Sequence, residues 1–167
     1  MILWITSIKS QGECGSCWAF AAVGAVESRY AIQGARDNRG LLDLSEQELV
    51  DCDNNGHGCK GGNRNYAFDY IAKKGISSEA DRLPLHRHQR HDEFELLTAV
   101  GYGPVAVGIS VGKNNNDFKY YEEGDGIYDG PCYRDSRHAI LLIGYTYGSY
   151  ILKNSWGQDP GLYVSQA

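Results

Sequence analysis

The sequence contains no long apolar run and no excess of basic residues, and both absences restrict its function. Every apolar stretch falls short of the roughly 20 residues that a membrane-spanning helix needs, so we expect no membrane association. The formal net charge of −5 argues against nucleic acid as a partner, because phosphate binding requires a basic surface. The opening segment Met1–Ile5 is short and lacks basic flanking residues, so we expect no secretory signal within this chain.

The remaining composition is that of a folded domain. The 167 residues are enough for a buried core, and apolar residues make up 42% of them. The 12 tyrosines and 21 glycines indicate a turn-rich, partly β architecture. Since neither an internal repeat nor a low-complexity linker interrupts the sequence, we expect a single domain over residues 1–167.

Apolar patterns predict helices in the first half of the chain and strands in the second. The near-continuous apolar residues after Cys17 predict a buried helix that reaches about Ile32. Ser45 and Glu48 have the spacing of a capping box, which predicts a short helix starting at Ser45. We expect a third helix over Asn63–Lys74. Runs rich in β-branched residues predict strands over residues 104–111, 139–145 and 150–153.

Cys17 stands at the start of the first predicted helix, and that position favours a reactive, nucleophilic side chain. A helix N-terminus favours the thiolate over the thiol, and the thiolate is the nucleophilic form. Gln11 shortly precedes it and carries an amide that can donate to an oxyanion at an attacked carbonyl. His138 opens a predicted strand and can exchange a proton with the thiol. Asn154 can orient the imidazole, and Trp156 can exclude water from the hydrogen bond between them.

Residues 11–20, Gln-Gly-Glu-Cys-Gly-Ser-Cys-Trp-Ala-Phe, resemble the nucleophile segment of papain-like cysteine proteases. Further matches follow in the family's order at residues 44–52, at residues 58–62, at His138-Ala139 and at residues 154–157. The resemblance implies an α+β, papain-like two-lobe fold with the active site in the cleft. Its helical N-terminal lobe would span approximately residues 11–80, and its β-rich C-terminal lobe residues 100–167.

The resemblance also implies a function and a set of partners. It predicts a cysteine-type peptidase, an endopeptidase that hydrolyses peptide bonds through an acyl-enzyme without a cofactor or a metal. The expected partners are peptide or protein substrates and proteinaceous cysteine-protease inhibitors, bound by a monomer. The expected location is lysosomal, vacuolar or secreted, because cysteine usage of this kind suits an oxidising compartment.

Individual roles follow from the same resemblance. Cys17 would be the nucleophile, His138 the base and then the acid, Asn154 the residue that orients His138, and Gln11 a donor to the oxyanion. The substrate would contact Gly61, Gly62, Gly108, Ala139 and Trp156. The family places a disulfide between Cys14 and Cys59.

The sequence departs from the family in its middle and near its C-terminus. Residues 82–91 do not match the longer, cysteine-containing connection that the family has there, so Cys52 lacks its usual partner. Cys132 lacks its partner too, and we expect both thiols to be unpaired. The distances along the chain from Cys17 to His138 and Asn154 are correspondingly near or below the lower end of the family's spacing of roughly 130–150 residues.

Two other functions stay open on the sequence. The first is a protease-like protein that binds peptides or inhibitors without turnover, which the departures from the family favour. The second is a zinc-binding module built from Cys14, Cys17, Cys52, His57 and Cys59. The basic segment with His86, His88 and His91 is interpreted as a solvated loop.

Overall fold

The computed structural model describes residues 4–34, 40–77, 93–111, 118, 127–128, 138–157 and 163–166. Within these ranges, four α-helices precede a four-stranded antiparallel sheet, and the sheet has the strand order β1-β2-β3-β4. The fold is therefore of the α+β class that the sequence predicts. Within the described residues, no helix has the length and apolar character to span a membrane.

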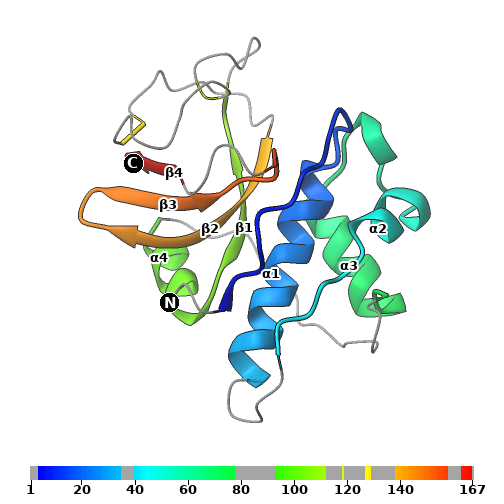
Figure 1. The fold of residues 1–167 in the computed structure, drawn as a ribbon, viewed down its shortest axis with the longest axis horizontal. Helices are drawn as coiled ribbons and strands as arrows, with labels where there is room; N and C mark the ends of the chain where they lie inside the picture. Colours follow the sequence, from blue (N-terminus) through cyan, green and yellow to red (C-terminus); the bar gives the residue numbers. More distant parts are fainter. Residues whose placement is uncertain are drawn as a thin grey trace.

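Helix α1, Cys17–Gly34, lies between the sheet and the other N-terminal helices (Figure 1). Trp18, Ala22 and Val23 are buried on one side of α1, in a cluster that includes Leu49 and Ile71. On its other side Gly24 faces β2, where an added Cβ would lie 3.2 Å from Leu141 Cδ2. This burial on two sides explains why the helix has no continuous polar face, and it confirms the predicted buried helix.

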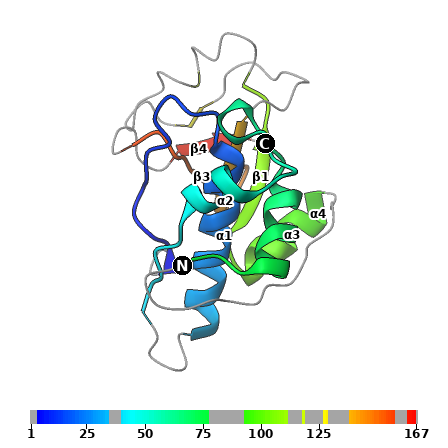
Figure 2. The same ribbon diagram turned by 90° about the vertical axis from the view of Figure 1, so that its right-hand side faces the viewer.

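The two following helices begin and end at the residues that cap them. In α2, Glu46–Cys52, the Ser45 side chain accepts the Glu48 N–H at 3.1 Å, as the capping box predicts. The Ser45 N–H donates to Ser77 O at 3.1 Å, and the Glu48 carboxylate accepts the N–H of Ser77 at 2.6 Å. Helix α3, Arg64–Lys74, starts at an Asn63 cap and ends at Gly75, whose φ of +79° suits glycine. In the view turned by 90°, α2 lies over α1 (Figure 2).

The sheet consists of β1, Val105–Ile109, β2, His138–Thr146, β3, Ser149–Lys153, and β4, Tyr163–Gln166. Strand β2 is buried on both faces, because Leu141 faces α1 while Ile140 and Leu142 join a cluster with Val100 of α4. Helix α4, Glu93–Tyr102, packs against β2 through this second cluster. The first three strands confirm the sequence prediction. The sequence patterns predicted neither α4, β4 nor the 3-10 turn η3, Gly58–Lys60.

A short antiparallel contact joins the segment before the nucleophile to the segment after β3. Ser10 and Trp156 form an isolated bridge, and the N–H of Gln11 donates to Ser155 O at 2.8 Å. On the other side of that bridge the Gly157 N–H donates to Lys9 O at 3.1 Å. The residues on either side of this contact form the candidate site.

Candidate active site

Cys17 is a free, partly exposed thiol on the first residue of α1. The loop before it is held by the disulfide between Cys14 and Cys59 and by the Gly15 N–H, which donates to Cys59 O at 2.9 Å. The backbone N–H of Ala139, in β2, donates to Cys17 Sγ at 3.4 Å. The start of α1 and the start of β2 therefore meet at the thiol, which places His138 and Cys17 at one site.

His138 forms a hydrogen bond of 2.8 Å between its Nε2 and Asn154 Oδ1. The same Asn154 oxygen accepts the Ser155 N–H at 2.9 Å, and this second donor fixes which end of the amide faces the imidazole. Because the oxygen can only accept, Nε2 carries the proton and donates. In the neutral ring, Nδ1 is then the unprotonated nitrogen that is free to act as a base.

The imidazole is shielded from water on one face. The Trp156 ring stacks on His138 with centroids 4.7 Å apart, and Phe118 meets the edge of Trp156 at 5.8 Å. His138 is 6% exposed, and this burial lowers its pKa below the ordinary 6.5, although the hydrogen bond to Asn154 acts in the opposite direction. Trp156 was predicted from the sequence to cover this hydrogen bond, whereas Phe118 was not predicted.

Gln11 has both ends of its side-chain amide occupied. Its Nε2 donates to Cys14 O at 2.8 Å, and its Oε1 accepts from the Ser155 hydroxyl at 2.7 Å. A primary amide has two N–H bonds, so one remains after the Cys14 contact. The sequence predicted the amide but not the contacts that hold it.

The four small residues predicted to contact the substrate lie in three settings. Gly62 packs against the Trp18 ring, where an added Cβ would lie 2.4 Å from ring atoms, whereas the Cβ position of Gly61 is open. Gly61 has a φ of +115°, which favours glycine. Gly108 and Ala139 are directly opposite each other in β1 and β2, and Gly108 is exposed. The last two therefore form one small-residue position in the sheet next to the thiol.

The zinc hypothesis is wrong for these cysteines, because the bonded sulfurs of Cys14 and Cys59 cannot serve as thiolate ligands. The part of the chain that the structure describes holds no group of three His, Cys, Asp or Glu side chains placed to bind a metal. Cys52 is a free, exposed thiol, as expected. Cys132, His86, His88 and His91 lie outside the described residues.

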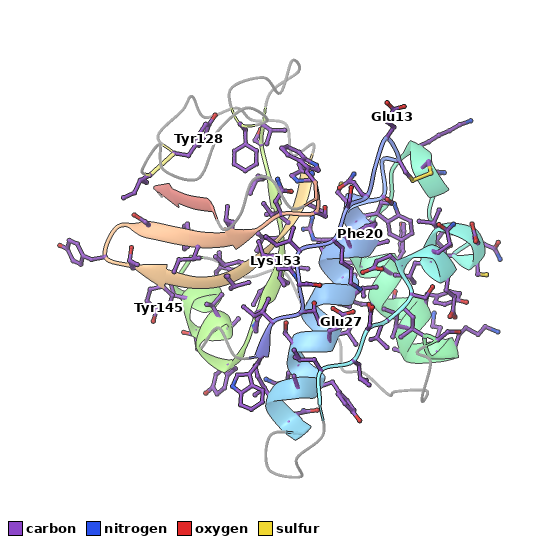
Figure 3. All side chains as sticks on the ribbon, in the orientation of Figure 1. Glu13, Phe20, Glu27, Tyr128, Tyr145 and Lys153 are labelled. Atoms are coloured by element: carbon purple, nitrogen blue, oxygen red, sulfur yellow. A yellow bond between two sulfur atoms is a disulfide. The ribbon has the colours of Figure 1, made fainter. Side chains whose placement is uncertain are left out.

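A cluster of charged residues lies between α1 and the sheet, and it is absent from the sequence predictions. Lys9 Nζ contacts Glu27 at 2.9 Å, Glu46 at 2.8 Å and Asp43 at 2.6 Å. Lys153 Nζ donates to Thr6 Oγ1, which in turn donates to Glu27. Figure 3 shows Glu27 and Lys153 in this region. A small cavity lined partly by these two residues also reaches Asn154 and Ser155.

Burial and charge act in opposite directions on these amines. Burial disfavours the Lys9 ammonium, yet its hydrogen bonds to Asp43, Glu46 and Glu27 outweigh this and raise its pKa above the ordinary range. At Lys153 burial dominates, and the pKa is lowered despite the nearby carboxylate of Glu27. Glu46 also has a raised pKa, because burial outweighs its contact with Lys9. The signal in the sequence was Glu27, an acid that directly follows the apolar run of residues 18–26.

Comparison with known proteins gives the family. Residues 2–93 and 82–164 match the family described as papain family cysteine protease. The chain is 37% identical over 185 residues to cysteine endopeptidase RepA of Oryza sativa subsp. japonica, covering 94% of this chain and 47% of that protein. It is 36% identical over 183 residues to caricain of Carica papaya, covering 94% of this chain and 50% of the relative.

A solved structure has the same fold. The Carica candamarcensis cysteine protease CMS1MS2, in complex with E-64, superposes with a TM-score of 0.84 at 30% sequence identity. That match covers 98% of this chain and 84% of the other. An α+β fold in which the strand that begins with His138 reaches a free thiol at a helix start has the architecture of papain-like proteins. This chain belongs to the papain family of cysteine proteases, and it spans about half the length of the curated relatives it matches.

Proposed function

We propose that the chain is a cysteine-type endopeptidase that uses Cys17 as its nucleophile. The observation that carries this proposal is the meeting of two elements at one sulfur. The Ala139 N–H donates to Cys17 Sγ, while His138, the preceding residue, is oriented by Asn154. Nothing in a purely structural role requires a free thiol, a desolvated imidazole and an orienting amide at the same place.

The first half of the reaction forms an acyl-enzyme. His138 Nδ1 takes the thiol proton, and the Cys17 thiolate attacks the carbonyl carbon of the scissile peptide bond. The carbonyl electron pair moves onto oxygen, where the remaining N–H of the Gln11 amide and the Cys17 backbone N–H stabilise it. The C–N bond then breaks as the imidazolium gives its proton to the departing amine, which leaves a thioester on Cys17.

The second half restores the thiol. A water molecule loses a proton to His138 and attacks the thioester carbonyl. The carbon–sulfur bond then breaks as the imidazolium returns that proton to Cys17 Sγ, and the carboxylic acid leaves. Asn154 keeps the imidazole aligned for both transfers, since its contact is made through Nε2 and leaves Nδ1 to exchange protons. Trp156 and Phe118 limit water at the ring on its covered face.

Substrates and partners follow from the same site. We propose that Gly61 and Gly62 admit an extended peptide backbone, that Trp156 borders its path, and that Gly108 and Ala139 form part of an apolar side-chain pocket. Peptides, proteins and proteinaceous inhibitors are the proposed partners of a monomer with a helical and a β-rich lobe. The Cys14–Cys59 disulfide supports an oxidising compartment, which is vacuolar, lysosomal or extracellular.

Labelling with E-64, which is bound in a related protease, tests the nucleophile. We expect the epoxysuccinyl group to modify Cys17 in preference to the exposed thiol of Cys52, as located by peptide mapping. Cys17→Ala is the control for the site, and hydrolysis of a peptide amide tests turnover. A folded sample in which Cys17 is not labelled would contradict the enzyme function. Labelling without hydrolysis would instead leave a protein that binds peptides without turnover.

A further inference from the structure

Lys60 is an exposed basic residue next to the two glycines that we assign to the substrate backbone. It is the last residue of η3 and directly precedes Gly61. Its backbone N–H donates to His57 O at 2.9 Å. Among the described residues no carboxylate lies within ion-pair distance of its ammonium, because the ion pairs found there are all made by Lys9. The Lys60 charge is therefore available to a bound molecule.

The loop that carries Lys60 is fixed against the nucleophile segment. The disulfide between Cys14 and Cys59 joins the residue before Lys60 to the segment before α1. The indole N–H of Trp18, the residue after the nucleophile, donates to Gly58 O at 3.3 Å. The second glycine of the pair packs on the same indole ring. The backbone on both sides of Lys60 is thus held close to the nucleophile.

The alternation of an extended peptide determines which substrate side chains can reach Lys60. Alternate side chains of such a peptide point to opposite sides of its backbone. A side chain in the proposed apolar pocket at Gly108 and Ala139 points toward the sheet. The side chains immediately before and after it then point the other way. The sheet and the segment with Lys60 lie on opposite sides of α1 (Figure 1), so these two neighbours face the side of the cleft that carries Lys60.

The charged residues close to Lys60 along the chain differ in sign and in placement. Glu13 adjoins the disulfide and is exposed, and it projects outward from the tip of its loop (Figure 3). Arg64 is half-buried at the start of α3, after the glycine pair. The two charged side chains that flank the segment 61–63 are therefore both basic.

We propose that Lys60 gives the protease a preference for peptides with an acidic side chain next to the apolar one. The substrate carboxylate pairs with the Lys60 ammonium at the solvent-exposed edge of the site. Because solvent screens such a pair, the preference is moderate and weakens as salt is added. The inference rests on the proposed peptidase function, since it concerns which peptides that site selects.

Peptide substrates that differ in one side chain test the preference. Each set carries glutamate, glutamine or lysine beside the same apolar residue, on its N-terminal side in one set and on its C-terminal side in the other. In one of the sets, kcat/KM for the glutamate peptide should exceed that for the glutamine peptide about two- to fivefold, the factor of one exposed ion pair, and the lysine peptide should be the poorest. Lys60→Gln should remove these differences, and Lys60→Glu should reverse their order. About 1 M NaCl should weaken the preference, because the screening length falls to about 3 Å.

Two further variants separate a local effect of Lys60 from a change in net charge. Lys73→Gln is the matched control, because it removes the same charge from an exposed lysine in the last turn of α3, and it should keep the wild-type preference. Glu13→Gln should also leave the glutamate peptide preferred. Equal kcat/KM for the three peptides of both sets in the wild type would overturn the inference while the peptidase function stands. The same loss of preference in Lys60→Gln and Lys73→Gln would overturn it too.

Peptide nitriles with the same side chains keep the inference testable if no peptide is hydrolysed. The thiol adds across the carbon–nitrogen triple bond, so a carbon–sulfur bond forms, the proton goes to nitrogen and nothing leaves. We expect the wild type to bind the glutamate nitrile about two- to fivefold more tightly than the glutamine nitrile, and Lys60→Gln to bind both equally. Binding without hydrolysis of any peptide would contradict the proposed function alone. Equal affinity of the wild type for both nitriles would overturn the role of Lys60.

Discussion

Two of the three carboxylates that contact the ammonium of Lys9 lie at similar distances but in different surroundings. Glu27 is 2.9 Å from Nζ and its side chain is 1% exposed, whereas Asp43 is 2.6 Å away and its side chain is 86% exposed. The Glu27 carboxylate also accepts the Leu44 N–H at 2.9 Å and the Thr6 hydroxyl at 2.7 Å. Distance alone would make Asp43 the more important partner, while burial makes Glu27 the more important one.

We expect Glu27→Gln to lower the free energy of unfolding by about 2–3 kcal/mol. The amide keeps the size of the side chain and one carbonyl oxygen, but it removes the charge from several hydrogen bonds. Bonds to a charged group contribute about 1.5–3 kcal/mol and neutral bonds about 1 kcal/mol. Lys9 keeps Glu46 as a partner, so the loss stays below the roughly 3–5 kcal/mol of leaving a buried charge unpaired. Asp43→Asn should change stability by only about 0–1 kcal/mol, because solvent screens that pair.

Urea unfolding followed by tryptophan fluorescence measures the difference. A Cys17→Ala background excludes self-digestion through the proposed peptidase activity and leaves the cluster around Lys9 intact. With a slope of about 2 kcal/mol/M, Glu27→Gln should lower the midpoint by about 1 M and leave the slope unchanged. Asp43→Asn should leave the midpoint nearly unchanged. A larger effect for Asp43→Asn than for Glu27→Gln would refute the reasoning that burial, and not distance, determines the strength of these pairs.

Two further predictions concern His138 and Gly62. Burial lowers the His138 pKa below 6.5, so the folded protein binds fewer protons than the unfolded chain, and stability should fall as the pH drops below about 6.5. In the Cys17→Ala background, the free energy of unfolding should be lower at about pH 5 than at about pH 7.5, and adding His138→Gln should remove this difference. The same pH dependence with and without His138→Gln would contradict the role of His138. Gly62→Ala should destabilise by about 1–3 kcal/mol through its contact with the Trp18 ring. Gly40→Ala, with open space around its Cβ, should not destabilise the protein in this way. Equal thermal midpoints for Gly62→Ala and Gly40→Ala would argue against close packing of Gly62 on Trp18.

Much of the fold could be predicted because its signals are local. The Ser45 cap, the Asn63–Lys74 pattern and the β-branched runs each act within a few residues, and the structure confirms the elements they predict. Strand β4 could not be predicted in the same way, because it is four residues long and, within the described residues, its pairing is with β3. Helix α4 lacked a capping pattern and depends on its packing against β2.

In the candidate site, too, the local features could be predicted and the long-range contacts could not. Cys17, His138, Asn154 and Gln11 could be named from the motifs around them, because reactive residue types occur there in the family's order. The contacts that hold these residues could not, since they join distant parts of the chain. The Ser155 hydroxyl lies within a motif that the sequence analysis used, yet only the structure shows its contact with Gln11 at 2.7 Å.

The last residue of β3 and the two residues that follow it bring these observations together. Lys153 reaches the charged cluster through Thr6, Asn154 holds His138, and Ser155 holds Gln11. Three consecutive residues thus contact three different parts of the molecule, two of which we assign to catalysis. An insertion anywhere among them would shift at least one of these contacts, because the chain rises about 3.3 Å per residue when extended. The order Asn154-Ser155 is therefore a stronger indication of an assembled site than either residue alone, and stability in the Lys9 cluster should be coupled to alignment at Cys17.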